Sequence, residues 1–244
     1  MSAPPTSPGP AQRRLQIELW SDLCSPRSYL AKRRWELAAQ QFEHPSEVLV
    51  RHRSFRLDPA RVRGDHVSER EWWCGEYGEG SPAARERAEQ LVTEALEVGL
   101  VIDLDRAVHT ATLDAHRLCH LGVEQGGPAQ QAAVLERLFA ARFAEGRALD
   151  DVDTLQRLGA EAGLDEVQLA SVLAGDAYAA AVRTDEESGR GHGLADVPAA
   201  VVNGGQVVEG APPVEALVAQ LQQAWRALGS SGTQSAAGSV SSSN

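Results

Sequence analysis

The sequence predicts an α/β fold whose middle is built only of helices. Three observations carry this prediction. The chain opens with the pattern of a strand, a helix and a second strand, and only helical periodicity follows over about residues 68–175. Strand patterns then return near the end as a hairpin, which a last helix follows.

The opening unit is predicted by alternation and by a helix start. Leu15, Ile17 and Leu19 alternate with polar residues, which is the period of a strand with one buried face. Ser25 and Pro26 then predict the start of a helix to about residue 41, since serine caps a free N–H and proline loses no hydrogen bond at the first position. The β-branched and apolar stretch "EVLVRHRSF" at 47–55 predicts the second strand.

The helical middle and the closing unit are predicted by the same kinds of pattern. Pro128 just inside the start and Gly146 just past the end delimit one helix. Near the end, "PAAVVNG" and "QVVEGA" predict a hairpin that turns at residues 203–205, and a closing helix runs from about 213 to 228. The helices expected between the two strand-bearing ends span 81–100, 112–125, 127–146, 150–164, 165–175 and 177–193.

Composition narrows the class of function. The net charge is −11 and no basic run exceeds "KRR", which disfavours nucleic acid or an anionic membrane as a partner. No stretch has the pattern of a secretory signal or a membrane span, so we expect a cytoplasmic protein. The three cysteines are odd in number and form no Cys-x-x-Cys pair. We therefore predict neither a disulfide framework nor a zinc site. Residues 1–14 and 229–244 are poor in large apolar side chains and predict disordered tails.

Four separated stretches resemble the DsbA superfamily, and specifically its FrnE-like branch. They are "WSDLCSPRSYLAKRR", "VRHRSFRLDP", "DAHRLCH" with the helices after it, and "GLADVPAAVVNGGQVVEGAPP". The resemblance covers about residues 15–228 and implies a thioredoxin-like fold with a large all-helical insertion. The thioredoxin-like domain would comprise 15–67 and 176–228, and the insertion 68–175. The resemblance also implies a cis peptide bond at Val197-Pro198, in a loop that faces the start of the first helix.

One departure from the family separates this chain from its redox-active members. Those members open the first helix with Cys-Pro-x-Cys, whereas this chain has Ser25-Pro26-Arg27-Ser28, and Cys24 lies one position too early. Thiol–disulfide exchange needs an attacking and a resolving thiol, and serine supplies neither. The motif resembles the Ser-Pro-x-Ser of kappa-class glutathione transferases and 2-hydroxychromene-2-carboxylate isomerases, in which the first serine faces the sulfur of a bound thiol.

This second resemblance implies a non-redox isomerase or thiol-assisted transferase. Its substrate would be a small aromatic or polyketide-type metabolite of specialised metabolism. A low-molecular-weight thiol, glutathione or mycothiol, is the cofactor it suggests, and a homodimer is plausible by analogy. Two alternatives stay open: a catalytically silent thioredoxin-fold binding or accessory protein, and a thiol–disulfide oxidoreductase that uses Cys24.

Each candidate site residue also has a plain structural interpretation. Ser25 is either only a helix cap or the group that holds a sulfur or oxyanion at the helix N-terminus. Arg27 could bind a carboxylate or phenolate or simply be solvated, and Cys24 is either a buried small side chain or a reactive thiol. The substrate- or cofactor-binding set predicted beside catalytic Ser25 is Cys24, Pro26, Arg27, Ser28, Val197, Pro198, Trp72 and Trp73.

Histidines and tryptophans complete the prediction. His116 and His120 lie four apart on one helix face, but no third ligand is legible, so no metal site is predicted. We expect His116 to act as an acid or base over the mouth of the site, with a structural role as the alternative. Trp72 and Trp73 are expected in a loop entering the helical block, where they either line an aromatic-binding pocket or seal the two parts together.

Overall fold

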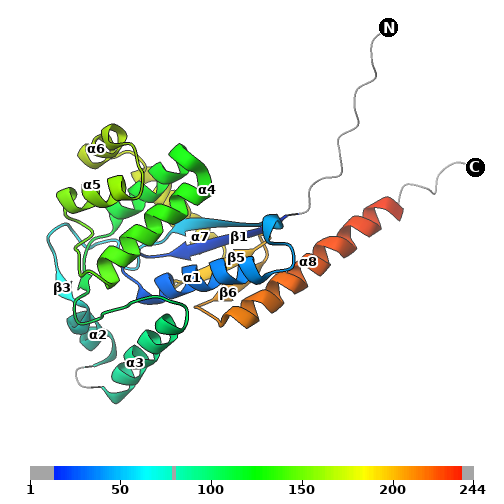
Figure 1. The fold of residues 1–244 in the computed structure, drawn as a ribbon, viewed down its shortest axis with the longest axis horizontal. Helices are drawn as coiled ribbons and strands as arrows, with labels where there is room; N and C mark the ends of the chain where they lie inside the picture. The colour runs from blue at the N-terminus through cyan, green and yellow to red at the C-terminus, as the bar shows by residue number, and fades with distance from the viewer. Residues whose placement is uncertain (1–13, 79–80, 238–244) are drawn as a thin grey trace, which may run out of the picture.

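A four-stranded sheet lies at the centre of the molecule (Figure 1). The computed structural model describes residues 14–78 and 81–237. The sheet is built of β1 (Leu15–Ser21), β2 (Val48–Ser54), β5 (Ala199–Val202) and β6 (Gln206–Glu209). β1 is parallel to β2 and antiparallel to β5, and β6 pairs antiparallel with β5, giving the order β2-β1-β5-β6.

Helices cover both faces of this sheet. They are α1 (Pro26–Gln41), α7 (Ala179–Gly191) and α8 (Val214–Ala237). α1 and α8 pack against each other on one face, where Leu15, Ile17 and Leu19 are fully buried (Figure 1). α7 packs against β2 on the other face, and the Trp20 indole Nε1 donates to the carbonyl oxygen of Asp185 in α7 at 2.8 Å. The strand predicted from alternation is confirmed, and Trp20 is buried because α7 covers the second face.

The middle of the chain is mainly helical, as predicted. Its helices are α2 (Glu69–Tyr77), α3 (Pro82–Glu97), α4 (Leu113–Phe143), α5 (Val152–Glu161) and α6 (Glu166–Ala174), and a short 3₁₀ turn (Pro45–Glu47) precedes β2. α4 is broken at Gly126 and Gly127, whose backbone angles are not helical. The break lies immediately before Pro128, where the sequence predicts a second helix to begin.

The expectation of helices alone between 68 and 175 is wrong at one place. β3 (Val67–Ser68) and β4 (Val108–His109) form a two-stranded antiparallel ladder next to the N-terminus of α2. Each strand is only two residues long, so no alternation is legible in the sequence. Their pairing joins positions about 40 residues apart, which a local pattern does not show.

Two further boundaries differ from the prediction. Trp72 and Trp73 lie in helix α2 rather than in a loop, because Ser68 and Glu71 form a capping box that starts the helix. The last helix continues to Ala237, so the tail predicted from 229 onward is helical up to there. The sequence after Leu228 has no proline to end a helix, and each glycine costs only about 1 kcal/mol. Residues 1–13 and 238–244 of the predicted tails lie outside the described residues.

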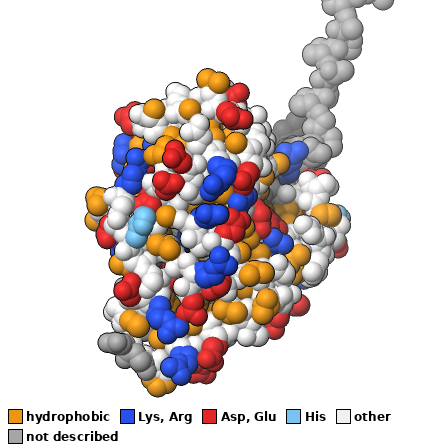
Figure 2. Space-filling view, turned by 60° about the vertical axis from the view of Figure 1, so that its left-hand side comes forward, with side chains coloured by type: hydrophobic (Ala, Val, Ile, Leu, Met, Phe, Trp, Pro, Cys, Tyr) orange, Lys and Arg blue, Asp and Glu red, His pale blue; other side chains and the backbone are white. Residues whose placement is uncertain are grey.

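The sheet part and the helical part share one buried boundary. Leu23 and Tyr29, at the start of α1, are buried within the apolar core of the helical part. The Tyr29 ring stacks on Phe139 of α4 with ring centroids 5.0 Å apart. On the face shown in Figure 2, basic and acidic side chains are interspersed rather than gathered by sign.

Candidate functional site

Ser25 caps helix α1 and keeps a hydrogen-bond donor. Its Oγ accepts from the Ser28 N–H at 3.2 Å, and its own N–H donates to the carbonyl of Asp22 at 3.0 Å. Pro26 takes the first helical position, as predicted. Because the cap uses the hydroxyl only as an acceptor, its O–H remains able to donate to a ligand.

Ser28 differs from Ser25 although the motif is symmetrical. Its side chain is fully buried, and its Oγ accepts a hydrogen bond from the backbone N–H of Asp22 at 3.3 Å. The hydroxyl therefore ties α1 to the end of β1. The predicted role of Ser28 in binding substrate or cofactor is not supported by this position.

The Asp22 carboxylate is the buried acceptor beneath the helix start. Its Oδ1 accepts from the Cys24 N–H at 3.1 Å, from Thr112 Oγ1 at 2.9 Å and from His116 Nε2 at 3.3 Å. Its Oδ2 accepts from the Leu57 N–H at 2.7 Å. Burial acts to raise the pKa of Asp22, but the hydrogen bond and charge of His116 and the two backbone N–H groups outweigh it and hold the pKa below its usual value.

His116, predicted to act as an acid or base, lies against the buried Asp22 carboxylate. Its Nε2 lies 3.3 Å from Asp22 Oδ1, so the imidazole orients that buried carboxylate. His120, on the same helix face, has a separate partner in Asp185, with Nε2 and Oδ2 3.2 Å apart. Within 14–78 and 81–237, no group of three or more His, Cys, Asp or Glu side chains is arranged to hold a metal ion.

Cys24 is a buried small side chain. Its Sγ donates to the carbonyl of Thr110 at 3.0 Å, and the residue is 4% exposed. Burial raises the pKa of the Cys24 thiol to about 12, although Arg142 nearby favours the thiolate. A thiol so rarely ionised is a poor nucleophile, and the structure thus opposes the oxidoreductase alternative.

A cavity of about 110 Å³ opens at the N-terminus of α1, and we call it the helix-end pocket. Its lining residues come from six parts of the chain: Cys24, Ser25, Pro26, Arg27, Leu57, Trp72, Trp73, Arg87, Leu91, His109, Asp196 and Val197. The pocket thus combines the helix start, the loop after β2, α2, α3, β4 and the loop before β5.

The helix-end pocket has aromatic walls and a charged rim. Trp72 stacks on His109, with ring centroids 4.9 Å apart and planes 8° from parallel. Arg27, Arg87 and Asp196 are the exposed charged lining residues. Two guanidinium groups against one carboxylate, together with the partial positive charge of the helix end, favour an anionic ligand.

The loop before β5 brings Val197 into the pocket. The Val197-Pro198 peptide bond is cis, as the resemblance implies. The Val197 N–H donates to Asp196 Oδ1 at 2.7 Å, and the described residues provide no hydrogen bond to the Val197 carbonyl. The carbonyl is therefore the backbone group left for a ligand at this position.

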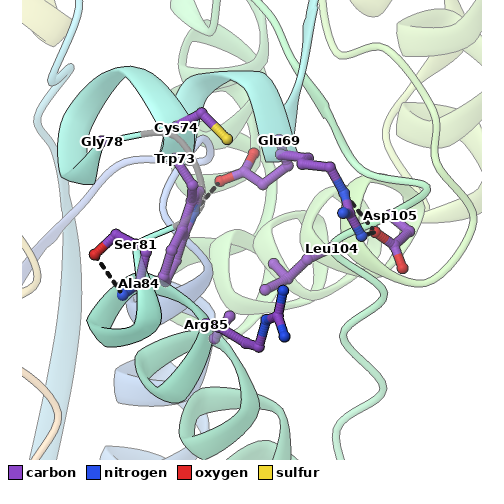
Figure 3. A pocket seen from close by; sticks show the side chains of 11 residues that line it. Glu69, Trp73, Cys74, Gly78, Ser81, Ala84, Arg85, Leu104 and Asp105 are labelled. Atoms are coloured by element: carbon purple, nitrogen blue, oxygen red, sulfur yellow. Dashed lines mark hydrogen bonds and ion pairs between the residues drawn. The ribbon is translucent and has the colours of Figure 1, made fainter.

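A buried ion pair supports the pocket from behind. Glu69 Oε2 lies 2.5 Å from Arg142 Nη2, and both side chains are fully buried. Glu69 Oε1 accepts from the Trp73 indole at 3.0 Å (Figure 3), and Glu69 Oε2 lies 3.8 Å from His109 Nδ1. Arg142 also donates to the carbonyl of Cys24 at 3.0 Å. The pair thus holds two walls of the pocket and the backbone just before Ser25.

The charge balance at Glu69 follows from these contacts. Burial acts to raise the pKa of Glu69, but Arg142, followed by His109 and Trp73, lowers it further than burial raises it. Glu69 is thus ionised and paired at neutral pH, so it adds no uncompensated negative charge to the pocket wall.

The structure brings most of the predicted site together and adds residues that the sequence did not indicate. The predicted residues found in the lining are Cys24, Ser25, Pro26, Arg27, Trp72, Trp73 and Val197. Pro198 follows Val197 across the cis bond, whereas Ser28 and His116 are buried behind the lining. The unpredicted lining residues are Leu57, Arg87, Leu91, His109 and Asp196, and no local pattern marks any of them as part of a site.

In the part of the chain that the structure covers, no helix has both the length and the apolar character to cross a bilayer. No curated protein sequence matches the chain significantly. The model of the DSBA-like thioredoxin domain family matches residues 16–222, which is most of the chain. The chain belongs to the DsbA-like family.

Solved structures similar to this chain support the family assignment, but their names refer to different activities. A probable DsbA oxidoreductase from Streptomyces coelicolor is 35% identical, with 87% of this chain and 90% of that chain covered and a TM-score of 0.82. A 2-hydroxychromene-2-carboxylate isomerase is 19% identical over 91% of this chain and 98% of its own, with a TM-score of 0.55. The cytosolic disulfide reductase DsbM from Pseudomonas aeruginosa is 20% identical over 90% of this chain and 98% of its own, also with a TM-score of 0.55. The last two show that this DsbA-like protein shares their fold.

Proposed function

We propose that this DsbA-like protein is a non-redox enzyme, an isomerase or thiol-assisted transferase of a small aromatic or polyketide-type metabolite. The observation that carries the proposal is Ser25 itself, which lines a pocket with aromatic walls exactly where redox members of the family have their first cysteine. The link to specialised metabolism comes from the resemblance of the sequence to the FrnE-like branch, and the proposed cytoplasmic location from the sequence pattern described above.

The size of the helix-end pocket limits what it can enclose. An engineered cavity of about 150 Å³ binds benzene, so a pocket of about 110 Å³ that opens to solvent holds roughly one ring or the end of a thiol. The rest of a larger ligand would extend past the rim. Arg27 and Arg87 there would meet the carboxylates of such a ligand.

The residues present fit a low-molecular-weight thiol. Such a thiol, when bound, supplies a nucleophile that can add reversibly to an enone. Ser25 would donate its O–H to the sulfur, the N-terminus of α1 would stabilise negative charge there, and the Val197 carbonyl would accept an N–H of the ligand backbone. The same helix end would stabilise a substrate enolate if no thiol is used.

We propose His109 in place of His116 as the group that moves a proton. His109 lines the helix-end pocket, and its Nδ1 faces the Glu69 carboxylate at 3.8 Å. The Glu69 carboxylate would stabilise positive charge on this imidazole, whose ring lies in the pocket wall where a substrate would bind.

One alternative function has an observation in its favour. The Ser25 hydroxyl already accepts from the Ser28 N–H, and this contact alone explains a serine at the helix start. A silent binding or accessory protein would need no more than this cap and the pocket. The name of the Streptomyces coelicolor relative favours redox chemistry, but Ser25 and Ser28 leave the first turn of α1 without the two sulfur atoms that this chemistry uses there in redox members.

The experiment compares three variants of Ser25 in a turnover screen. Aromatic enones and cis/trans ketone pairs are incubated with and without glutathione or mycothiol, and products are followed by chromatography and mass spectrometry. Ser25→Thr keeps both the cap and the hydroxyl and should retain turnover. Ser25→Asp keeps the cap but brings a negative charge to the anion site, so it should fold normally and lose activity about 100-fold or more.

Ser25→Ala separates the remaining possibilities. It removes the cap and the donor together and should cost about 1 kcal/mol of stability as well as activity. Undiminished turnover by Ser25→Asp would contradict the proposed mechanism. Wild-type protein that binds aromatic ligands in the pocket but turns over none would favour the silent binding protein.

A further inference from the structure

A second cavity also has Trp73 in its lining, and we call it the α2–α3 pocket. Its volume is about 190 Å³, larger than the helix-end pocket. We propose that the α2–α3 pocket is a separate binding site for a small molecule with an apolar ring and one carboxylate, independent of any chemistry at Ser25. The side chains that carry the argument are Trp73, Ala84, Arg85, Ala88, Leu104 and Asp105 (Figure 3).

The walls of the α2–α3 pocket suit a flat apolar group. Trp73 comes from α2, Ala84 and Ala88 lie one turn apart on α3, and Leu104 comes from the loop after α3. The two alanines leave room beside the indole that larger side chains would fill. Since a cavity of about 150 Å³ holds benzene, this pocket has room for one ring with a short substituent.

Among the described residues, the charges around the α2–α3 pocket leave one cation, Arg85, without an ion pair. Arg70 is paired with Asp105 at 2.6 Å, and Glu69 is paired with Arg142 at 2.5 Å. Arg85 has no ion pair among the described residues, and Figure 3 shows its side chain extending from α3 toward Leu104. An arginine that borders an apolar cavity, with neighbouring carboxylates already paired, favours a ligand carboxylate.

The N-terminus of α3 adds to this preference. Ser81 caps the helix by accepting from the Ala84 N–H at 3.4 Å, and both residues line the pocket. The partial positive charge of the helix end therefore lies on the same side of the cavity as Arg85. The cavity, the unpaired guanidinium and the helix end together indicate an anionic ligand rather than a neutral one.

The α2–α3 pocket shares a wall with the proposed catalytic pocket. Trp73 lines both cavities, and its indole N–H is held by Glu69 at 3.0 Å. A ligand in either pocket would contact the same indole. Variants must therefore be chosen from side chains that line one pocket only.

The test measures binding by ¹⁹F NMR with the full chain, using 4-fluorobenzoate and its neutral counterpart 4-fluorobenzamide. We expect the benzoate to bind more tightly than the benzamide. Arg85→Gln should weaken benzoate binding about fivefold, as expected for a solvent-exposed charge pair, and leave the benzamide unchanged. Arg85→Lys keeps the charge and should lose less.

Arg87→Gln is the matched control, because Arg87 lies two residues along the same helix and lines only the helix-end pocket. Ala88→Phe should abolish binding of both probes by filling the α2–α3 pocket, and circular dichroism and thermal melting establish that each variant is folded. Equal affinity for the two probes, no binding at millimolar concentration, or an equal loss in Arg87→Gln and Arg85→Gln would overturn the proposal. Because no outcome depends on turnover, its failure is distinct from a failure of the proposed enzyme activity.

Discussion

Ser25 and Ser28 have the same side chain and different surroundings, and this difference decides their roles. Ser25 lines the helix-end pocket, whereas the Ser28 hydroxyl is buried against the Asp22 N–H. The motif predicted both as site residues, because a three-residue spacing on the first turn places two side chains near each other without showing which one meets solvent. Of the two serines, only the first lines the helix-end pocket.

Cys24 provides the sharpest test at the scale of single residues. Burial raises its pKa to about 12, so roughly one thiol in ten thousand is ionised at pH 8. Burial also raises the pKa of Cys119, whereas Cys74 is half-buried and lines the α2–α3 pocket. Iodoacetamide at pH 8 should therefore modify Cys74 first, and Cys24 and Cys119 only after unfolding in urea.

Mass spectrometry of the digested protein measures the extent of alkylation at each position. The unfolded chain serves as the control, in which all three thiols should react at similar rates. Modification of Cys24 in the native protein as fast as Cys74 would restore the oxidoreductase interpretation.

At the scale of elements, α2 connects the helical part of the molecule to the site. Its capping box, Ser68 with Glu71, was legible as a Ser-x-x-Glu pattern and would have placed Trp72 and Trp73 on a helix. The burial of Glu69 and its pairing with Arg142 were not legible, because a charge on a helix ordinarily predicts a solvated face. The role of His109 was also hidden, since its two-residue strand pairs with distant Val67.

The Glu69–Arg142 pair predicts a large loss of stability when one partner is removed. Arg142→Met leaves a fully buried carboxylate without its cation and should reduce the free energy of unfolding by about 3–5 kcal/mol. Adding Glu69→Gln to this variant should recover part of the loss. Urea unfolding followed by tryptophan fluorescence measures both effects.

Arg137→Met is the matched control on the same helix. Arg137 pairs with Glu145 and Glu161 at the surface, where screening by water limits the expected loss to under about 1 kcal/mol. Equal losses for Arg137→Met and Arg142→Met would show that burial of the inner pair adds nothing to its importance.

At the scale of the whole molecule, the order of strands and helices was predictable from the sequence, but the tertiary contacts between them were not. The alternation in β1 and the capping residues of α1 are short-range patterns, so both elements can be recognised from the sequence. The helix-end pocket instead requires six separated segments to meet, and the core of the helical part is completed by Leu23 and Tyr29 from the other part. We propose on this basis that the predicted insertion, 68–175, does not fold independently.

Stability should depend on pH through one buried histidine. His52 lies on β2. Its backbone N–H donates to Gln131 Oε1 at 3.3 Å, and its backbone carbonyl accepts from Gln131 Nε2 at 2.9 Å. Burial, with the nearby charge of Lys32, lowers the pKa of His52 from 6.5 to about 3. The unfolded chain therefore binds a proton below about pH 6.5 that the folded chain does not, so folding stability falls as the pH falls.

Between pH 7 and pH 5 this difference amounts to about 2 kcal/mol, and His52→Leu should remove that part of the pH dependence. The buried carboxylates Asp22 and Glu69 have lowered pKa values, so their contributions to stability are present above about pH 5 and are lost only in stronger acid. Urea unfolding of both proteins at pH 7, 6 and 5 measures the effect as the difference between their two curves. Parallel curves would mean that folding leaves the pKa of His52 unchanged, because a histidine kept neutral by folding makes only the wild-type protein lose this stability toward acid.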